Sequence, residues 1–227
     1  MNKFEKEMVD VLHKLKEEHG VIGVKAEFEA EGSRFNELIR LKEILSKVDL
    51  GLYIKIGGCE AVRDILDCEI IGVEGIIAPM IESPFALKKY VSMVKDFVPE
   101  PLIKQINFGI TFETKTAHRQ LDEILKTEEF DFLSTFTIGR TDLVRSYDLG
   151  RKNVNSDEML GYCNDIFQRL EGKQNLIKCV GGSVSGDAKE FIETLRLNGL
   201  NRFETRKVIF NADNNSPYEE NLRTAMK

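Results

Sequence analysis

The sequence predicts an α/β fold, a TIM-type (β/α)8 barrel, from three observations. Short apolar segments alternate with amphipathic helical patterns along the whole chain, which is typical of parallel strands joined by crossover helices. Neither G-x-G-x-x-G nor G-x-x-x-x-G-K-[ST] follows the first strand, so the two commonest nucleotide-binding open sheets lack their fingerprints. The chain has 227 residues, somewhat below the roughly 250 residues of a complete barrel.

The first predicted element is a helix over Asn2–His19. Phe4, Met8, Leu12 and Leu15 recur at helical spacing in this segment. We expect this amphipathic helix to pack on the body of the protein.

Seven short apolar segments are predicted as strands. They are Ile22–Phe28, Leu52–Ile56, Gly75–Pro79, Ile106–Phe112, Phe132–Ile138, Leu176–Val180 and Arg206–Phe210.

Helical patterns fill the intervals between these strands. One begins at Ser33, and another follows Ser83-Pro84, where serine suits the N-cap and proline the first helical position. A third begins near Thr114, and two more cover Ser156–Leu170 and Gly186–Leu197. No linker, repeat or low-complexity tract interrupts the order, so a single barrel domain over residues 1–227 is expected, with a helix over 1–20 and a tail over 211–227.

One strand of an eightfold barrel is missing from this pattern. The place of a first strand is taken by the predicted N-terminal helix, so we expect a missing or atypical first strand. Either a cryptic strand lies around Val21–Val24, with its successor compressed into Lys25–Glu29, or the barrel is incomplete.

Composition restricts the class of protein. Lys and Arg number 32 against 38 Asp and Glu, a net charge of −6, which argues against a nucleic-acid partner. The longest apolar stretch, Ile70–Ile81, is interrupted by Glu74 and is shorter than the roughly 18 apolar residues of a membrane span. The four cysteines are scattered without a CxxC pair, as in reduced structural thiols. A cytoplasmic protein with no membrane partner is expected, and we expect it to form a homo-oligomer.

Polar residues follow the predicted strands at the places where a barrel carries its active site, the carboxyl ends of the strands. Several carboxylates converging in one mouth repel each other unless a cation lies among them, and hard oxygen ligands suit Mg²⁺ or Mn²⁺. The candidate residues are Glu27, Glu29, Glu31, Lys55, Glu82, Glu113, Arg140, Asp142, Gly181, Gly182 and Ser183. By contrast, Glu204 and Arg206 flank the entry to the last predicted strand, and we expect them to form an ion pair at the opposite, N-terminal side of the barrel.

Three motifs then resemble a known family. The segment 112–117, Phe-Glu-Thr-Lys-Thr-Ala, resembles the strand-to-helix "ET" motif of the HpcH/HpaI aldolase and citrate lyase family, in the phosphoenolpyruvate/pyruvate-type barrel superfamily. The segment 138–143, Ile-Gly-Arg-Thr-Asp-Leu, resembles its "G-x-x-DL" motif, and 79–83, Pro-Met-Ile-Glu-Ser, resembles its "P-x-[VI]-E-S" turn. The motifs cover the central part of the chain, about residues 51–150.

The resemblance implies a lyase that makes or breaks a carbon–carbon bond through the enolate of a small 2-keto acid or related carboxylate. It implies that Glu113 and Asp142 ligate Mg²⁺ or Mn²⁺. Lys55 stands where most members have an arginine that binds the substrate carboxylate, and it keeps the charge without the bidentate fork. The histidine of the pyruvate-aldolase branch has no counterpart. We therefore expect catalytic roles for Lys55, Glu29 and Glu31.

Plainer interpretations stand beside these assignments. Asp142 also suits a turn after a strand, Glu82 suits the start of a helix, and Arg140 suits a solvated loop as well as an anionic substrate. The Gly181–Ser183 turn fits either a tight connection or backbone binding of a phosphate or carboxylate.

Two other functions remain open on the same barrel. The first is an acyl-CoA lyase subunit or a keto-acid decarboxylase. The second is a non-catalytic barrel that binds a small acid.

Overall fold

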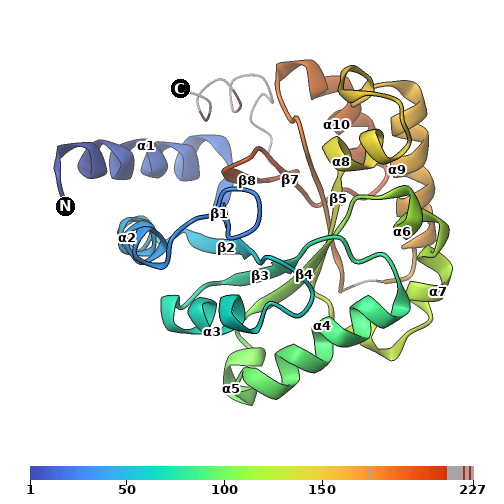
Figure 1. Cartoon of the computed structure of the whole chain (residues 1–227). Helices are drawn as coiled ribbons and strands as arrows, with labels where there is room; N and C mark the ends of the chain where they lie inside the picture. Colours follow the sequence, from blue (N-terminus) through green and yellow to red (C-terminus); the bar gives the residue numbers. More distant parts are fainter. Residues whose placement is uncertain (174, 214–221, 223–224, 226–227) are drawn as a thin grey trace.

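In the computed structural model the chain forms a closed eight-stranded barrel surrounded by helices (Figure 1). Residues 1–173, 175–213, 222 and 225 are described. The strands are β1 (Val21–Glu27), β2 (Gly51–Lys55), β3 (Gly75–Ala78), β4 (Asn107–Phe112), β5 (Thr135–Gly139), β6 (Ile177–Gly181), β7 (Arg202–Glu204) and β8 (Val208–Asn211). The TIM-type barrel predicted from the pattern is confirmed.

The helices lie outside the barrel, and Ser83 caps α4 as predicted. They are α1 (Lys3–His19), α2 (Phe35–Leu45), α3 (Val62–Ile71), α4 (Pro84–Phe97), α5 (Glu100–Ile103), α6 (Lys115–Arg119), α7 (Leu121–Leu125), α8 (Arg140–Ser146), α9 (Asp157–Arg169) and α10 (Lys189–Leu197). Short 3₁₀ turns are η1 (Glu128–Phe132), η2 (Arg151–Asn153) and η3 (Gly186–Ala188). Ser83, Thr114 and Ser156 each accept a backbone N–H at a helix start. None of the helices in the described part of the chain is long and apolar enough to cross a membrane.

The irregular part of the barrel is its end, and the prediction of an atypical first strand is wrong. β1 is one continuous strand that pairs in parallel with β2 from Gly23 to Glu27. β7 has three residues and was not predicted, and β8 turns back to run antiparallel to both β7 and β1. A two-strand hairpin without a crossover helix closes the barrel. Of the predicted tail, Asn211 ends β8 and Ala212 is buried, whereas 214–221, 223, 224, 226 and 227 lie outside the described residues.

Side chains alternate between two environments along each strand. Val24, Ala26 and Ile54 belong to the large apolar core between the sheet and the helices. The apolar cluster of Tyr53, Ile77 and Ile209 is separate and fills the lower interior of the barrel.

Glycines leave room for this interior cluster. A Cβ on Gly75 would overlap Tyr53 Cδ1, and one on Gly23 would lie 2.7 Å from Tyr53 Cε2. Nearer the carboxyl ends of the strands, the inward-facing side chains are polar. This part of the interior is a cavity and is not filled by apolar side chains.

Candidate active site

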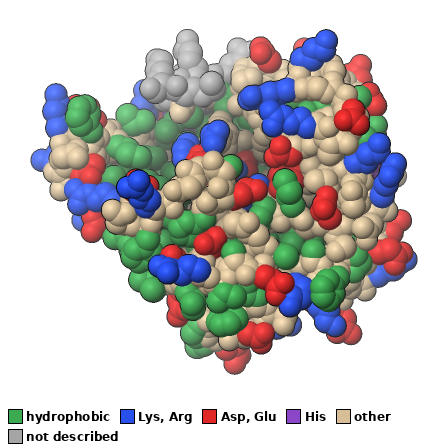
Figure 2. All heavy atoms as spheres, in the orientation of Figure 1, with side chains coloured by type: hydrophobic (Ala, Val, Ile, Leu, Met, Phe, Trp, Pro, Cys, Tyr) green, Lys and Arg blue, Asp and Glu red, His purple; other side chains and the backbone are tan. Residues whose placement is uncertain are grey.

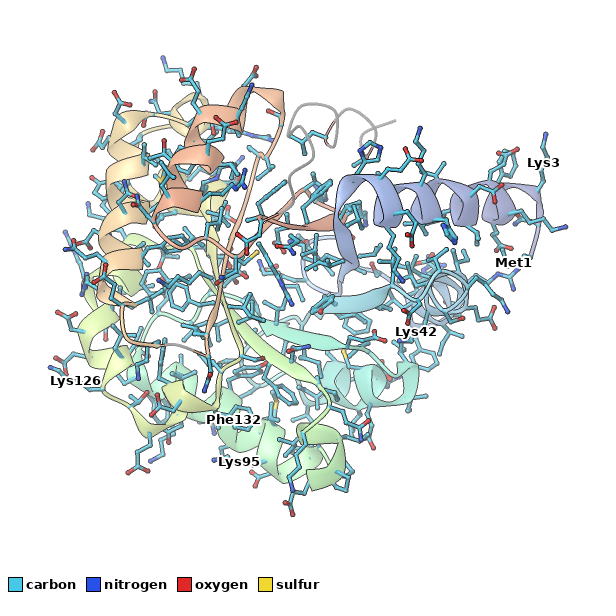
Figure 3. All side chains as sticks on the ribbon, turned by 180° about the vertical axis from the view of Figure 1, so that it is seen from behind. Met1, Lys3, Lys42, Lys95, Lys126 and Phe132 are labelled. Atoms are coloured by element: carbon cyan, nitrogen blue, oxygen red, sulfur yellow. The ribbon has the colours of Figure 1, made fainter. Side chains whose placement is uncertain are left out.

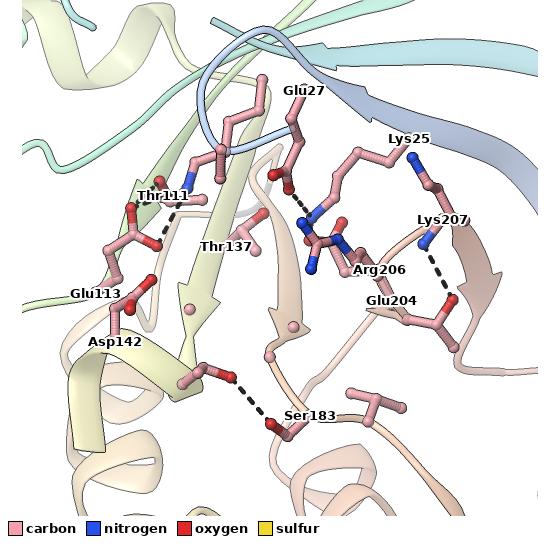
Figure 4. Close-up of a pocket in the computed structure, with 18 of the residues that line it drawn as sticks. Lys25, Glu27, Thr111, Glu113, Thr137, Asp142, Ser183, Glu204, Arg206 and Lys207 are labelled. Atoms are coloured by element: carbon pink, nitrogen blue, oxygen red, sulfur yellow. Dashed lines mark hydrogen bonds and ion pairs between the residues drawn. The ribbon is translucent and has the colours of Figure 1, made fainter. Parts of the chain in front are cut away.

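A cavity of about 660 Å³ opens at the carboxyl ends of the strands. Glu113 and Asp142 lie together on one side of it, Lys25, Glu204, Arg206 and Lys207 lie on the other, and Thr137 lies between (Figure 4). Of the eleven candidate residues predicted from the sequence, eight line it: Glu27, Glu29, Lys55, Glu113, Asp142, Gly181, Gly182 and Ser183. The rule that barrel sites form at the carboxyl ends of strands therefore selected the correct end of the molecule for these residues.

Lys55 and Glu113 form a buried ion pair on the floor of the cavity. Lys55 ends β2, and its Nζ lies 3.2 Å from Glu113 Oε1 and 2.8 Å from Glu29 Oε2. Burial would lower the pKa of Lys55, but Glu113 and Glu29 outweigh it, so the pKa lies above its usual value. The raised pKa keeps the ammonium group charged at neutral pH.

A second buried pair faces the first. Lys25 is in β1, and its Nζ lies 2.5 Å from Glu204 Oε1 and 3.5 Å from Glu27 Oε1. Burial opposes the charge on Lys25, yet Glu204 and Glu27 more than compensate and raise its pKa. Each lysine has two carboxylate neighbours, so the floor of the cavity carries more negative than positive charge.

Two glycines at strand ends make room for the paired carboxylates. A Cβ on Gly139 would lie 2.5 Å from Glu113 Oε2, and a Cβ on Gly181 would lie 2.8 Å from Glu204 Oε1. Any larger residue at these inward-facing positions would push the carboxylates out of the site.

The donor set fits a hydrated divalent cation held by two protein ligands. Glu113 Oε1 accepts from Thr111 Oγ1 at 2.8 Å and from Met80 N–H at 3.2 Å, which orients the carboxylate. Among the described residues, Oε2 has one donor, Lys55 Nζ at 3.4 Å. Asp142, in the first turn of α8, is partly exposed and pairs with Arg145 at 3.7 Å. The described residues contain no group of three His, Cys, Asp or Glu placed to hold a metal. Mg²⁺ is commonly bound by one or two carboxylates with water and substrate in the remaining positions, and Glu113 with Asp142 meets that requirement.

Arg140 is buried beneath the cavity and is not part of its lining. Its Nε donates to Gly181 O at 3.2 Å, one terminal nitrogen donates to Gly182 O at 2.8 Å, and the other donates to Asn155 Oδ1 at 2.7 Å. The guanidinium also lies 4.5 Å from the centre of the Phe191 ring. Arg140 therefore holds the loop after β6 in place, which differs from both sequence-based interpretations of this residue.

Two other predicted residues also lie outside the cavity. Glu31 accepts from Arg206 Nε at 2.8 Å and from Lys207 Nζ. Glu82 is half-buried in the turn between β3 and α4. Of the two carboxylates predicted to act as catalytic groups, the one on the cavity is Glu29.

The expected ion pair between Glu204 and Arg206 is wrong. Glu204 pairs with Lys25, whereas Arg206 pairs with Glu31. Because β8 runs antiparallel, the turn from β7 to β8 lies at the mouth of the barrel and not at the opposite end.

Lys25, Thr111 and Thr137 also line the cavity and were not predicted from the sequence. The usable signal was the alternation in β1, where Lys25 and Glu27 stand two residues apart in an otherwise apolar strand. Charged residues are rarely buried without a partner, so both side chains needed one inside the barrel.

The fold and the position of the site place the protein among TIM-type α/β barrels. It is similar to citrate synthase SbnG, with 16% identity, a TM-score of 0.68, and coverage of 88% of this chain and 81% of that chain. It is also similar to the HpcH/HpaI aldolase from Desulfitobacterium hafniense DCB-2 (15% identity, TM-score 0.70, 88% and 80% covered). A third similar structure is an HpcH/HpaI aldolase/citrate lyase family protein from Burkholderia cenocepacia J2315 (10%, 0.65, 90% and 92%).

At these identities the likeness shows a shared fold. No protein-family model and no curated protein matches the sequence. The solved structures that share the fold include members of the family whose motifs the chain resembles.

Proposed function

We propose that the protein is a divalent-metal-dependent carbon–carbon lyase or aldolase that acts on a small 2-keto acid through its enolate. The observation that carries the proposal is the arrangement of Glu113, Asp142 and Lys55. Two carboxylates from neighbouring strand ends face one cavity, and a buried, charged lysine lies against one of them. The motif resemblance around Glu113 and Asp142 supports the proposal, as does the shared fold with two aldolase-family structures.

Glu113 and Asp142 would hold the cation. A bound Mg²⁺ or Mn²⁺ supplies Lewis acidity, which polarises the keto oxygen and stabilises negative charge on it. Lys55 binds the carboxylate of the keto acid through its ammonium group, at the place where the family usually has an arginine. Glu29, which lies 2.8 Å from Lys55 Nζ and faces the cavity, moves the proton at the carbon next to the keto group.

Calorimetric titration of Mn²⁺ tests the metal assignment. We expect Glu113→Ala and Asp142→Ala each to weaken Mn²⁺ binding at least roughly tenfold, because each removes one of two protein ligands. Glu82→Ala is the matched control, since this carboxylate lies outside the cavity, and it should bind Mn²⁺ like the wild type. Equal affinity in all four proteins would rule out Glu113 and Asp142 as the metal ligands.

A substrate screen then separates the reactions open to this site. Pyruvate with aldehydes, oxaloacetate alone, and malyl or citramalyl thioesters report aldol addition, decarboxylation and acyl-CoA cleavage respectively. We expect turnover with pyruvate and an aldehyde.

A further inference from the structure

Within the described residues, four exposed cations lie around the mouth of the cavity, and we call them the basic rim. They are Arg145 from α8, Arg151 from η2, and Arg206 and Lys207 from the β7–β8 turn, and all four line the cavity and are exposed. Figure 2 shows Lys and Arg side chains on two sides of the hollow. Two distant parts of the sequence, residues 145–151 and 206–207, supply the rim, so it does not stand out as one cluster in the sequence.

The floor and the rim of the cavity therefore differ in the sign of their excess charge. On the floor, Lys25 and Lys55 are each matched by two carboxylates. At the rim, Arg206 and Lys207 share the single carboxylate of Glu31. A floor of this kind suits a metal cation, whereas the rim suits an anion.

Among the described residues, Arg151 is the rim cation with the fewest carboxylate partners. Arg145 has Asp142 at 3.7 Å, but no ion pair involving Arg151 occurs within the part of the chain that the structure describes. Asn155 links the segment after Arg151 to the loop after β6. Its side chain accepts a hydrogen bond from Arg140 and donates one to Asp187 O at 3.3 Å.

The loop after β6 lines the same cavity with Gly181, Gly182 and Ser183. The Arg140 guanidinium donates hydrogen bonds to the carbonyl oxygens of Gly181 and Gly182. In a trans peptide the N–H points opposite to the C=O, so the N–H groups of Gly182 and Ser183 point away from Arg140. Within the described residues these two N–H groups have no hydrogen-bond acceptor, and both residues line the cavity.

The backbone of this loop is held in an unusual conformation. Gly182 has φ +81° and Ser183, which carries a side chain, has φ +52°. The Ser183 hydroxyl lies 3.1 Å from Thr141 Oγ1, which links the loop to the first turn of α8. Strain of this kind at a cavity is a common feature of ligand-binding loops.

We propose that the Gly182–Ser183 loop and the basic rim bind a phosphate group at the far end of the substrate. A phosphate offers three oxygens, and it is well matched by backbone N–H groups together with arginine side chains. The inference rests on the proposed function for the reacting end of the molecule. It narrows the substrate class to a 2-keto acid that is joined to, or split from, an aldehyde carrying a phosphate monoester.

Calorimetric titration of inorganic phosphate, at low salt and with EDTA present, tests the subsite without metal or keto acid. We expect the wild type to bind phosphate and Arg151→Ala to bind it roughly tenfold more weakly, the loss of one charge-assisted contact. Arg151→Glu should abolish binding. Lys152→Ala is the matched control, because this neighbouring cation is exposed and lies outside the cavity lining, and it should bind phosphate within about twofold of the wild type.

Two results would overturn the inference. One is a wild type that does not bind phosphate at millimolar concentration, and the other is Arg151→Ala with unchanged affinity. Since no metal is present, either result leaves the Mn²⁺ titration of Glu113 and Asp142 untouched, and a failed Mn²⁺ titration leaves the phosphate result intact.

Discussion

Replacing Lys55 by methionine is expected to reduce exchange of the pyruvate methyl protons at least roughly 100-fold, because the substrate carboxylate loses its cation. The same change leaves Glu113 buried without its charge partner, and we expect unfolding by urea to show a loss of roughly 3–5 kcal/mol. Lys55→Arg keeps the charge and supplies a bidentate fork, so it should retain more exchange activity than Lys55→Met.

A second variant separates stability from activity. In Lys55→Met/Glu113→Gln the buried carboxylate no longer needs a cation, so stability should recover relative to Lys55→Met while exchange stays low. Lys88→Met, on the exposed surface of α4, is the control and should match the wild type in both measurements. Wild-type exchange and wild-type stability in Lys55→Met would show that the buried pair has no role in the site.

Replacing Arg140 by methionine should destabilise the protein by roughly 3–5 kcal/mol. Arg140 is fully buried, and its loss leaves the carbonyls of Gly181 and Gly182 and the Asn155 amide oxygen without their donor. Arg140→Lys, with a point charge in place of the fork, should fall between methionine and the wild type.

The matched control is Arg196→Met, an exposed arginine of α10, which should change stability by less than about 0.5 kcal/mol. The free energy of unfolding from urea titration is the measurement for all of these variants. If Arg140→Met unfolds at the same urea concentration as Arg196→Met, then Arg140 does not hold the loop after β6.

Most of the barrel follows from local patterns because its first six strands are apolar runs separated by helices. The pattern failed at β7, which has three residues, of which only Phe203 is apolar. Without that strand the direction of β8 could not be predicted, since a hairpin and a crossover differ only in the intervening segment. The wrong end of the barrel was therefore assigned to Glu204 and Arg206.

A site residue could be predicted from the sequence where its position at the end of a strand is enough to bring its side chain to the cavity. Glu113 directly follows β4 and Lys55 ends β2, and both reach the cavity. Arg140 also follows a strand, but whether its long side chain turns into the cavity or beneath it depends on tertiary acceptors, the carbonyls of a loop 41 residues away. The basic rim depends on the same kind of long-range assembly.

The most direct test of the central claim is incorporation of deuterium into the pyruvate methyl group in D₂O, followed over time by mass spectrometry of the pyruvate, first with Mn²⁺ or Mg²⁺ and then with EDTA. Glu113→Gln and Asp142→Asn are examined beside the wild type, and circular dichroism checks that each variant is folded. We expect exchange in the wild type that needs the divalent cation, stops with EDTA and is lost in both variants. Absence of exchange with either cation, or exchange that persists with EDTA and in both variants, would contradict it.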